Sequence, residues 1–184
     1  MHASSLLTLT LALLSGASAL VLPAVQPDGL YQVHRSASGE EIHTRIELAP
    51  TTTSPSTSPN HLAKRAFGQT HCGCGIKVNA KDTDAAVADL KSQLGKNGHR
   101  INPAMSYYSV RGGVVAFVCN LDGNAVLKAW VDIITQAAEQ ITGACGKYVA
   151  GSTGAQYNFA IGYMNNAKGL DFCGKALGAP AESC

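Results

Sequence analysis

Residues 106–119 read SYYSVRGGVVAFVC, and this stretch decides the fold. Two runs rich in aromatic and β-branched residues flank Arg111-Gly112-Gly113, a combination typical of a β-hairpin. The second run, residues 114–119, is apolar at every position, so both faces of that strand need to be buried. The stretch therefore predicts a hairpin whose second strand lies in the interior of a sheet.

Two amphipathic segments on either side of this hairpin predict helices. The first follows Asp82-Thr83-Asp84, which supplies an N-cap and first-turn acids, and it ends at Gly95. The second begins after Asn124 as its N-cap and ends at Gly143. Apolar residues recur at helical spacing in both. These stripes are Ala86, Val87, Leu90 and Leu94 in the first helix, and Ala125, Val126, Ala129, Trp130, Ile133, Ile134, Ala137 and Ile141 in the second.

Period-two alternation predicts a strand before the first helix and another after the second. The aligned residues are Cys72, Cys74, Ile76 and Val78 in the first strand, which we expect to face the core, and Tyr157, Phe159, Ile161 and Tyr163 in the last.

The order of these elements predicts the fold class. Strand, helix, hairpin, helix and final strand or strands make an α+β fold, and more finely a disulfide-stapled two-layer α/β sandwich of split β-α-β type. Its antiparallel sheet carries both helices on one face. The other face is expected to meet solvent or a short layer of the carboxy-terminal tail.

The amino terminus predicts a secreted protein. A leucine-rich run at residues 6–14 precedes Ala17-Ser18-Ala19, a small-residue pattern that a signal peptidase recognises, so residues 1–19 are predicted to be a signal peptide. The alternative is a membrane anchor, but the apolar run is well short of the about 20 residues that a spanning helix needs. We expect an extracellular protein with no stable membrane anchor.

A dibasic pair predicts a second cut. Lys64-Arg65 follows the Ser-, Thr- and Pro-rich residues 51–59, which are too polar to pack into a core and would be accessible to a kexin-type protease. All six cysteines lie after this pair, as expected when disulfides hold together only the downstream part. We therefore expect a disposable pro-segment at residues 20–65 and a mature disulfide-rich α/β domain at residues 66–184.

Two alternating runs in the pro-segment, residues 29–34 and 41–46, predict a small hairpin around residues 36–39. A lone hairpin is marginal in water. We expect it to act only while attached, as a folding aid or a mask.

The sequence leaves the disulfide pairing open. Cys72 and Cys74 lie about 7 Å apart on one strand face, so they should seek different partners. Natural candidates are Cys119 and Cys145, with Cys173 and Cys184 tying down the tail. The alternative is a zinc site at Cys72, Cys74 and His71, which is disfavoured because no second closely spaced cysteine pair exists. We expect neither metal nor cofactor.

The predicted mature domain offers few groups for catalysis. A hydrolase or ribonuclease would have to use His99 with Glu139 or Arg100, and no nucleophile or metalloprotease motif accompanies them. His99 is more typical of a solvated loop, and Glu139 of the polar face of its helix. The chain carries a net charge of only +2 with no basic stripe, which gives no support to nucleic-acid binding.

Two other features have ordinary structural interpretations. Residues 151–154, Gly-Ser-Thr-Gly, resemble a phosphate cradle, but a turn between two strands is the stronger interpretation. Trp130 shares the apolar stripe of its helix and is expected in the core.

Several of these patterns occur together in one known family. They are Cys72-Gly73-Cys74, the GGVVAFV run at residues 112–118, the helix end at Gly143-Ala144-Cys145-Gly146, and Ile161-Gly162-Tyr163-Met164 followed by a cysteine. In these the chain resembles the killer-toxin-like secreted proteins of fungi, which include virally encoded smut killer toxins and many small effectors of plant pathogens. The resemblance implies a split β-α-β sandwich, kexin-type processing at a Lys-Arg pair, and no catalytic residues.

We therefore expect a non-catalytic effector or killer-toxin-like protein. It would bind a host or competitor protein, or a cell-surface target, after kexin-type processing. Two alternatives remain, a small secreted hydrolase or ribonuclease and a cell-wall or surface structural protein. The latter predicts exposed apolar patches and self-assembly.

Overall fold

The central hairpin forms as predicted in the computed structural model, which describes residues 20–23, 26–47, 67–94, 98–129, 131–154 and 159–174. Strand β5 (Met105–Arg111) pairs antiparallel with β6 (Val114–Asn120), with Tyr108 opposite Phe117. Every residue of β6 is buried, and β6 lies between β5 and β9 (Phe159–Asn165). The prediction of an interior strand is confirmed.

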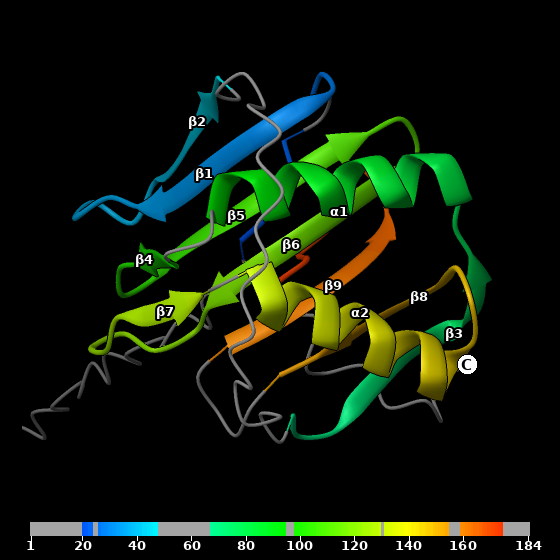
Figure 1. Ribbon diagram of the computed structural model, residues 1–184. Helices are drawn as coiled ribbons and strands as arrows, with labels where there is room; N and C mark the ends of the chain where they lie inside the picture. The colour runs from blue at the N-terminus through cyan, green and yellow to red at the C-terminus, as the bar shows by residue number, and fades with distance from the viewer. Residues whose placement is uncertain are drawn as a thin grey trace, which may run out of the picture.

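Seven strands of the described part form one antiparallel sheet, in the order β2-β1-β5-β6-β9-β8-β3 (Figure 1). Strands β4 (His99–Ile101) and β7 (Leu127–Ala129) pair with each other in a separate small sheet. The remaining strands are β1 (Gly29–Arg35), β2 (Glu41–Ile46), β3 (Thr70–Lys77) and β8 (Val149–Thr153).

Both helices pack against the same face of this sheet (Figure 1). Helix α1 (Ala80–Leu94) contacts β5 and β6, whereas α2 (Val131–Cys145) contacts β3, β8 and β9. Their apolar stripes join the facing side chains of the strands in one buried cluster. Phe159, Ile161 and Tyr163 of the predicted last strand all belong to this cluster, while Tyr157 lies outside the described residues. The predicted α+β class, with a large antiparallel sheet and two helices, is confirmed.

Helix α1 begins earlier than the sequence suggests. It starts at Ala80, and the Asn79 side chain accepts a hydrogen bond from the Asp82 amide at 3.0 Å. Asn79 is therefore the N-cap, and the prediction of a cap within residues 82–84 is wrong because those residues already form the first turn. Gly95, the predicted end, lies outside the described residues.

Helix α2 begins later than predicted. Asp122 turns the chain by accepting the amides of Asn124 and Ala125 at 2.7 and 2.9 Å, and residues 127–129 form strand β7. The helix then runs from Val131 to Cys145, past the predicted end at Gly143. Gly146, with a left-handed φ of +99°, terminates it by donating to the Thr142 carbonyl at 3.0 Å. Trp130 lies outside the described residues.

The small sheet replaces a predicted loop. His99 lies on β4, opposite Ala129 of β7, rather than in a solvated loop. Buried Asn120 holds this region together, because its side-chain amide donates to the carbonyls of Ile101, Asn102 and Ala125 at 2.8–3.0 Å. A short strand paired at long range leaves no periodic signal, which explains why the pattern missed it.

Strand β3 forms one edge of the sheet and is irregular. Its pairing with β8 shifts between Cys72 and Lys77, where Gly75 adopts a left-handed φ of +71°. This irregularity turns Ile76 outward to 47 % exposure, so the prediction that it faces the core is wrong. The predicted turn at residues 151–154 is also wrong, because residues up to Thr153 belong to β8.

The second face of the sheet is covered rather than open to solvent. Leu20, Leu22 and Phe172 pack there against Tyr108, Phe117 and other side chains in a second buried cluster. The Leu22 amide donates to the Leu170 carbonyl at 2.9 Å, so residues 20–22 and the carboxy-terminal turn at residues 167–174 lie side by side. The covering layer thus combines the predicted tail with a segment assigned to the pro-segment.

The predicted hairpin of the pro-segment forms, and it belongs to the main sheet. Strand β1 pairs with β2 on one side and with β5 on the other. The boundary at residues 65 and 66 therefore divides the chain within a single sheet. The predicted signal peptide, Lys64 and Arg65 lie outside the described residues.

One glycine is required by close approach. A Cβ atom at Gly162 on β9 would clash with the Gly151 carbonyl oxygen, which cannot move without disturbing the sheet. We expect Gly162→Ala to lower the free energy of unfolding by about 1–3 kcal/mol. The control Gly143→Ala adds a Cβ with nothing within 4 Å on a helix, and it should raise the stability by about 0.5–1 kcal/mol. Urea unfolding of both variants checks the opposite signs.

Candidate functional site

Two disulfides cross-link the described part of the chain. Cys72 on β3 bonds Cys145 at the end of α2, with Cα atoms 5.4 Å apart. Cys119 on β6 bonds Cys173 in the carboxy-terminal turn, with Cα atoms 5.9 Å apart. Cys145 is one of the two partners expected for the Cys72/Cys74 pair. Cys119, the other expected partner, bonds Cys173 of the tail instead, because both cysteines belong to the buried cluster on the second face. Cys184 and the side chain of Cys74 lie outside the described residues.

A mostly apolar hollow of about 230 Å³ opens between β3, β8, the end of β9 and the turn that follows it. Ile76, Met164 and Leu170 contribute large apolar side chains to its wall. Cys72 also lines the hollow, and its disulfide to Cys145 fixes β3 to α2. Sequence reasoning placed Ile76 in the core and so missed this site.

His71 is one of the polar residues that line the hollow. Its Nδ1 atom is buried and, among the described residues, has no hydrogen-bond partner. A buried polar atom without a partner is costly. The hollow itself can accept an apolar group, because large apolar side chains form much of its wall.

His99 has a different role from the catalytic one considered above. Its Nε2 atom lies 2.7 Å from the Tyr107 hydroxyl, which donates in turn to the Gln32 side chain at 3.1 Å. Burial raises the pKa of Tyr107 above its usual value. Within the described ranges, no hydrogen bond or ion pair joins His99 to Glu139 or Arg100, and both of these are exposed. Neither of the two pairings considered for a hydrolase or ribonuclease, His99 with Glu139 or His99 with Arg100, is formed by such a contact.

A carboxylate, an imidazole and a phenol meet on the second face. His43 Nδ1 lies 2.9 Å from the Tyr108 hydroxyl, and His43 Nε2 lies 3.6 Å from Glu41. Burial raises the pKa of Tyr108 strongly, with smaller contributions from Tyr31 and Glu41. Tyr108 is 0 % exposed and stacks on Tyr31 with ring centroids 5.0 Å apart, so it is enclosed within the protein. The group fastens the hairpin of β1 and β2 to the sheet.

This group makes stability depend on pH. Burial lowers the pKa of His43 below its ordinary 6.5, against an opposing effect of Glu41. Below pH 6.5 the unfolded chain binds the proton first, so the free energy of unfolding falls with decreasing pH and levels off below the folded pKa. Urea unfolding of the wild type and of His43→Asn between about pH 5 and 7.5 checks this. A variant with the same pH dependence as the wild type would contradict it.

An ion pair anchors α1 to the sheet. Asp89, 8 % exposed, accepts two hydrogen bonds from Arg111 at 2.7 and 3.0 Å and one from Ser109 at 2.7 Å. The hydrogen bond to Asp89 raises the pKa of Arg111. No local sequence pattern indicates this pair, because its partners are 22 residues apart on different elements.

Neither family models, nor curated proteins, nor solved structures yield a match to this chain. None of the described helices is long and apolar enough to cross a membrane. Within the described part of the chain, no group of three or more His, Cys, Asp or Glu side chains is arranged to hold a metal ion.

Proposed function

We propose that this chain is a secreted, non-catalytic fungal effector or killer-toxin-like protein, which binds a host or competitor protein after kexin-type processing at Lys64-Arg65. The observation that carries the proposal is the apolar hollow beside Ile76, because it offers a partner a concave site with an exposed apolar rim. The family resemblance supports the secreted and non-catalytic character.

The size of the hollow favours a protein partner. Small-molecule pockets usually enclose about 300–1,000 Å³, whereas this one encloses about 230 Å³. A large apolar side chain projecting from a partner fits such a volume. Contacts of this kind, with one anchor residue in a pocket, dominate the affinity of many protein interfaces.

The disulfide at the hollow supports the same function. It joins Cys72, on the wall, to Cys145 of α2, so the irregular edge strand β3 is held in place before a partner arrives. Because this strand is already ordered, binding a partner does not incur the further conformational-entropy cost of ordering it.

The finer architecture is part of the proposal. The chain is assigned to the two-layer sandwiches of split β-α-β topology, the arrangement that the killer-toxin-like resemblance implies. Two helices on one face of an antiparallel sheet support this assignment.

Binding of the labelled secreted protein to intact fungal cells and to plant cell-surface protein extracts tests the proposal. We expect saturable binding to one of these, weakened about tenfold or more by Ile76→Asp, because a charge would enter the apolar rim. The matched control is Ile42→Asp, since Ile42 is 40 % exposed on β2 at the opposite edge of the sheet. It should bind like the wild type.

Other outcomes would overturn the proposal. Hydrolysis of RNA, peptide or glycan substrates that is lost when His71 and His99 are replaced together would indicate the enzyme. Self-assembly of the purified protein in sedimentation experiments would indicate the structural protein. Equal weakening by both isoleucine variants would remove the hollow as the contact site.

A further inference from the structure

The segment assigned to the pro-segment is built into the sheet. We propose that residues 20–65 stay bound after the cut at Lys64-Arg65, so that the secreted protein consists of two chains, the first anchored by an ion pair between its new α-ammonium at Leu20 and Asp171. This inference rests on the processing in the proposed function. According to this inference, the cut leaves residues 20–65 bound to the rest of the protein instead of releasing them.

Strand β1 supplies the main contact. It lies between β2 and β5 and pairs with β5 from Gly29 opposite Val110 to His34 opposite Met105. Leu30 is 0 % exposed in the helix-side cluster, and Val33 is 0 % exposed in the cluster on the second face. Release would expose apolar surface on both faces of the sheet together with the free edge of β5.

Side chains and backbone groups beyond the strand pairing tie the segment to the rest of the chain. Asp28 accepts the Gly112 amide at 2.9 Å, and Gln32 accepts the Tyr107 hydroxyl at 3.1 Å. His43 contacts the buried Tyr108 hydroxyl at 2.9 Å. Loss of the segment would remove these three contacts from the larger piece and leave the Tyr107 hydroxyl with His99 alone, which opposes dissociation.

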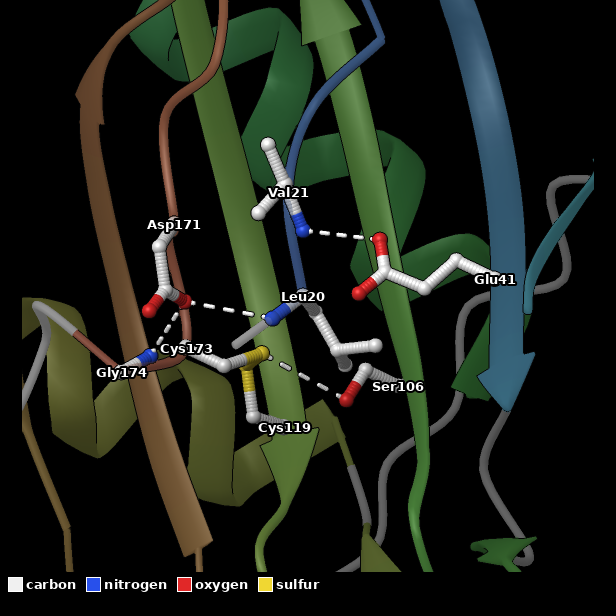
Figure 2. Close-up of a disulfide and its surroundings, with 8 residues drawn as sticks. All are labelled: Leu20, Val21, Glu41, Ser106, Cys119, Asp171, Cys173 and Gly174. Atoms are coloured by element: carbon white, nitrogen blue, oxygen red, sulfur yellow. Dashed lines mark hydrogen bonds between the residues drawn. A yellow bond between two sulfur atoms is a disulfide. The ribbon is translucent and has the colours of Figure 1, made fainter. Parts of the chain in front are cut away.

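The amino end of the segment has its own binding place (Figure 2). The Leu20 backbone nitrogen donates to Asp171 Oδ1 at 3.2 Å, beside the Cys119–Cys173 disulfide. The next residue is held as well, since the Val21 amide donates to Glu41 at 3.0 Å. Leu20 itself is buried in the cluster on the second face. The contact therefore joins a fixed nitrogen to a fixed carboxylate.

Signal-peptide removal would change the charge of this contact. Hydrolysis of the Ala19–Leu20 bond by a signal peptidase consumes one water, leaving a carboxylate on Ala19 and an α-ammonium on Leu20. The amide nitrogen that donates to Asp171 then becomes a cation at the same place, within the distance of a salt bridge. Charge-assisted hydrogen bonds are about twice as strong as neutral ones. The cut thus strengthens the anchor of the new amino terminus.

The second cut leaves the described contacts intact. Lys64 and Arg65 fall between the described residues 47 and 67, so hydrolysis there breaks none of the described strand pairs. Because residues 20–65 contain no cysteine, no disulfide can join the two pieces. They would be held by noncovalent contacts alone, which makes the proposal testable without a reducing agent.

The test expresses the full chain in a secreting host with a kexin-type protease and compares native with denaturing mass spectrometry. We expect a native mass equal to both pieces, and two separate masses in denaturant whose sequences begin at Leu20 and Ala66. A native particle containing residues 66–184 alone would overturn retention. An uncut secreted chain would contradict the processing instead. A site-specific protease sequence replacing Lys64-Arg65 then decides retention by the same measurement.

The anchor is tested by Asp171→Asn, which keeps an acceptor for the Gly174 amide but removes the charge. We expect the two pieces of this variant to dissociate about tenfold faster than those of the wild type. Added salt should accelerate dissociation less in the variant than in the wild type, because the variant has no ion pair to screen. Asp132→Asn, which removes an exposed charge on α2, is the control and should behave like the wild type. If Asp171→Asn and the wild type dissociated at the same rate and with the same salt dependence, the ion pair would not contribute to anchoring the segment.

Discussion

Replacing Phe172 with alanine is expected to lower the free energy of unfolding by about 3–5 kcal/mol. Phe172 is 0 % exposed, and its ring centroid lies 5.1 Å from that of Tyr108 and 5.6 Å from that of Phe117. The Cys119–Cys173 disulfide holds the neighbouring backbone in place, so the structure cannot close around the missing ring. A cavity would remain between the sheet and its covering layer, and cavities of this kind add to the loss of apolar contact.

Urea unfolding of the disulfide-intact protein measures this effect. Phe67→Ala is the matched control, because Phe67 is only partly buried and meets Phe159 edge to face at 6.4 Å. Its loss should be clearly smaller than that of Phe172. If Phe172→Ala cost no more than the control, the second face would not form a core, and the covering layer would contribute little to stability.

Replacing Asp89 with alanine is expected to cost about 3 kcal/mol. The substitution leaves the Ser109 hydroxyl buried and the Arg111 guanidinium without its carboxylate. We place the loss at the lower end of the range for broken buried ion pairs, because the Arg111 side chain is 32 % exposed and water can replace part of the contact. Helix α1 would also lose its only described polar contacts with β5, which are the hydrogen bonds that Asp89 accepts from Ser109 and Arg111.

Glu139→Ala provides the control for this prediction, since Glu139 is an exposed acid in the middle of α2. Its effect should stay within about 0.5 kcal/mol. Asp89→Asn should fall between the two, because an amide oxygen still accepts one hydrogen bond. Equal stability of Asp89→Ala and Glu139→Ala would show that the pair adds nothing to the packing of α1.

The parts of the fold that local pattern predicts are those with long, regular runs. Residues 114–119, apolar on both faces, identified the inner strand β6, and the alternating residues 29–34 and 41–46 identified β1 and β2 almost to their ends. The stripe from Ile133 to Ile141 identified most of α2. In each case the signal lies within the element itself, so neighbours in sequence are sufficient.

The parts that were missed depend on partners far away in the sequence. Strands β4 and β7 have three residues each and exist because buried Asn120 and their mutual pairing hold them. The outward turn of Ile76 follows from the glycine conformation at Gly75. The hollow, the Asp89 pair and the His43 group all join residues of different elements. No periodicity within one segment records such contacts.

The order of strands has a consequence for how the chain is made. Three of the pairings, β1–β2, β5–β6 and β8–β9, join strands that are consecutive in the main sheet and in the sequence, so each can close soon after it is synthesised. The other three pairings in the sheet, β1–β5, β6–β9 and β3–β8, each require a strand that is made much later. Assembly that depends on such distant partners is slow. During synthesis the early hairpin of β1 and β2 therefore lacks its neighbour β5, and β6 and β3 cannot complete their pairings until the carboxy-terminal strands β8 and β9 have been made.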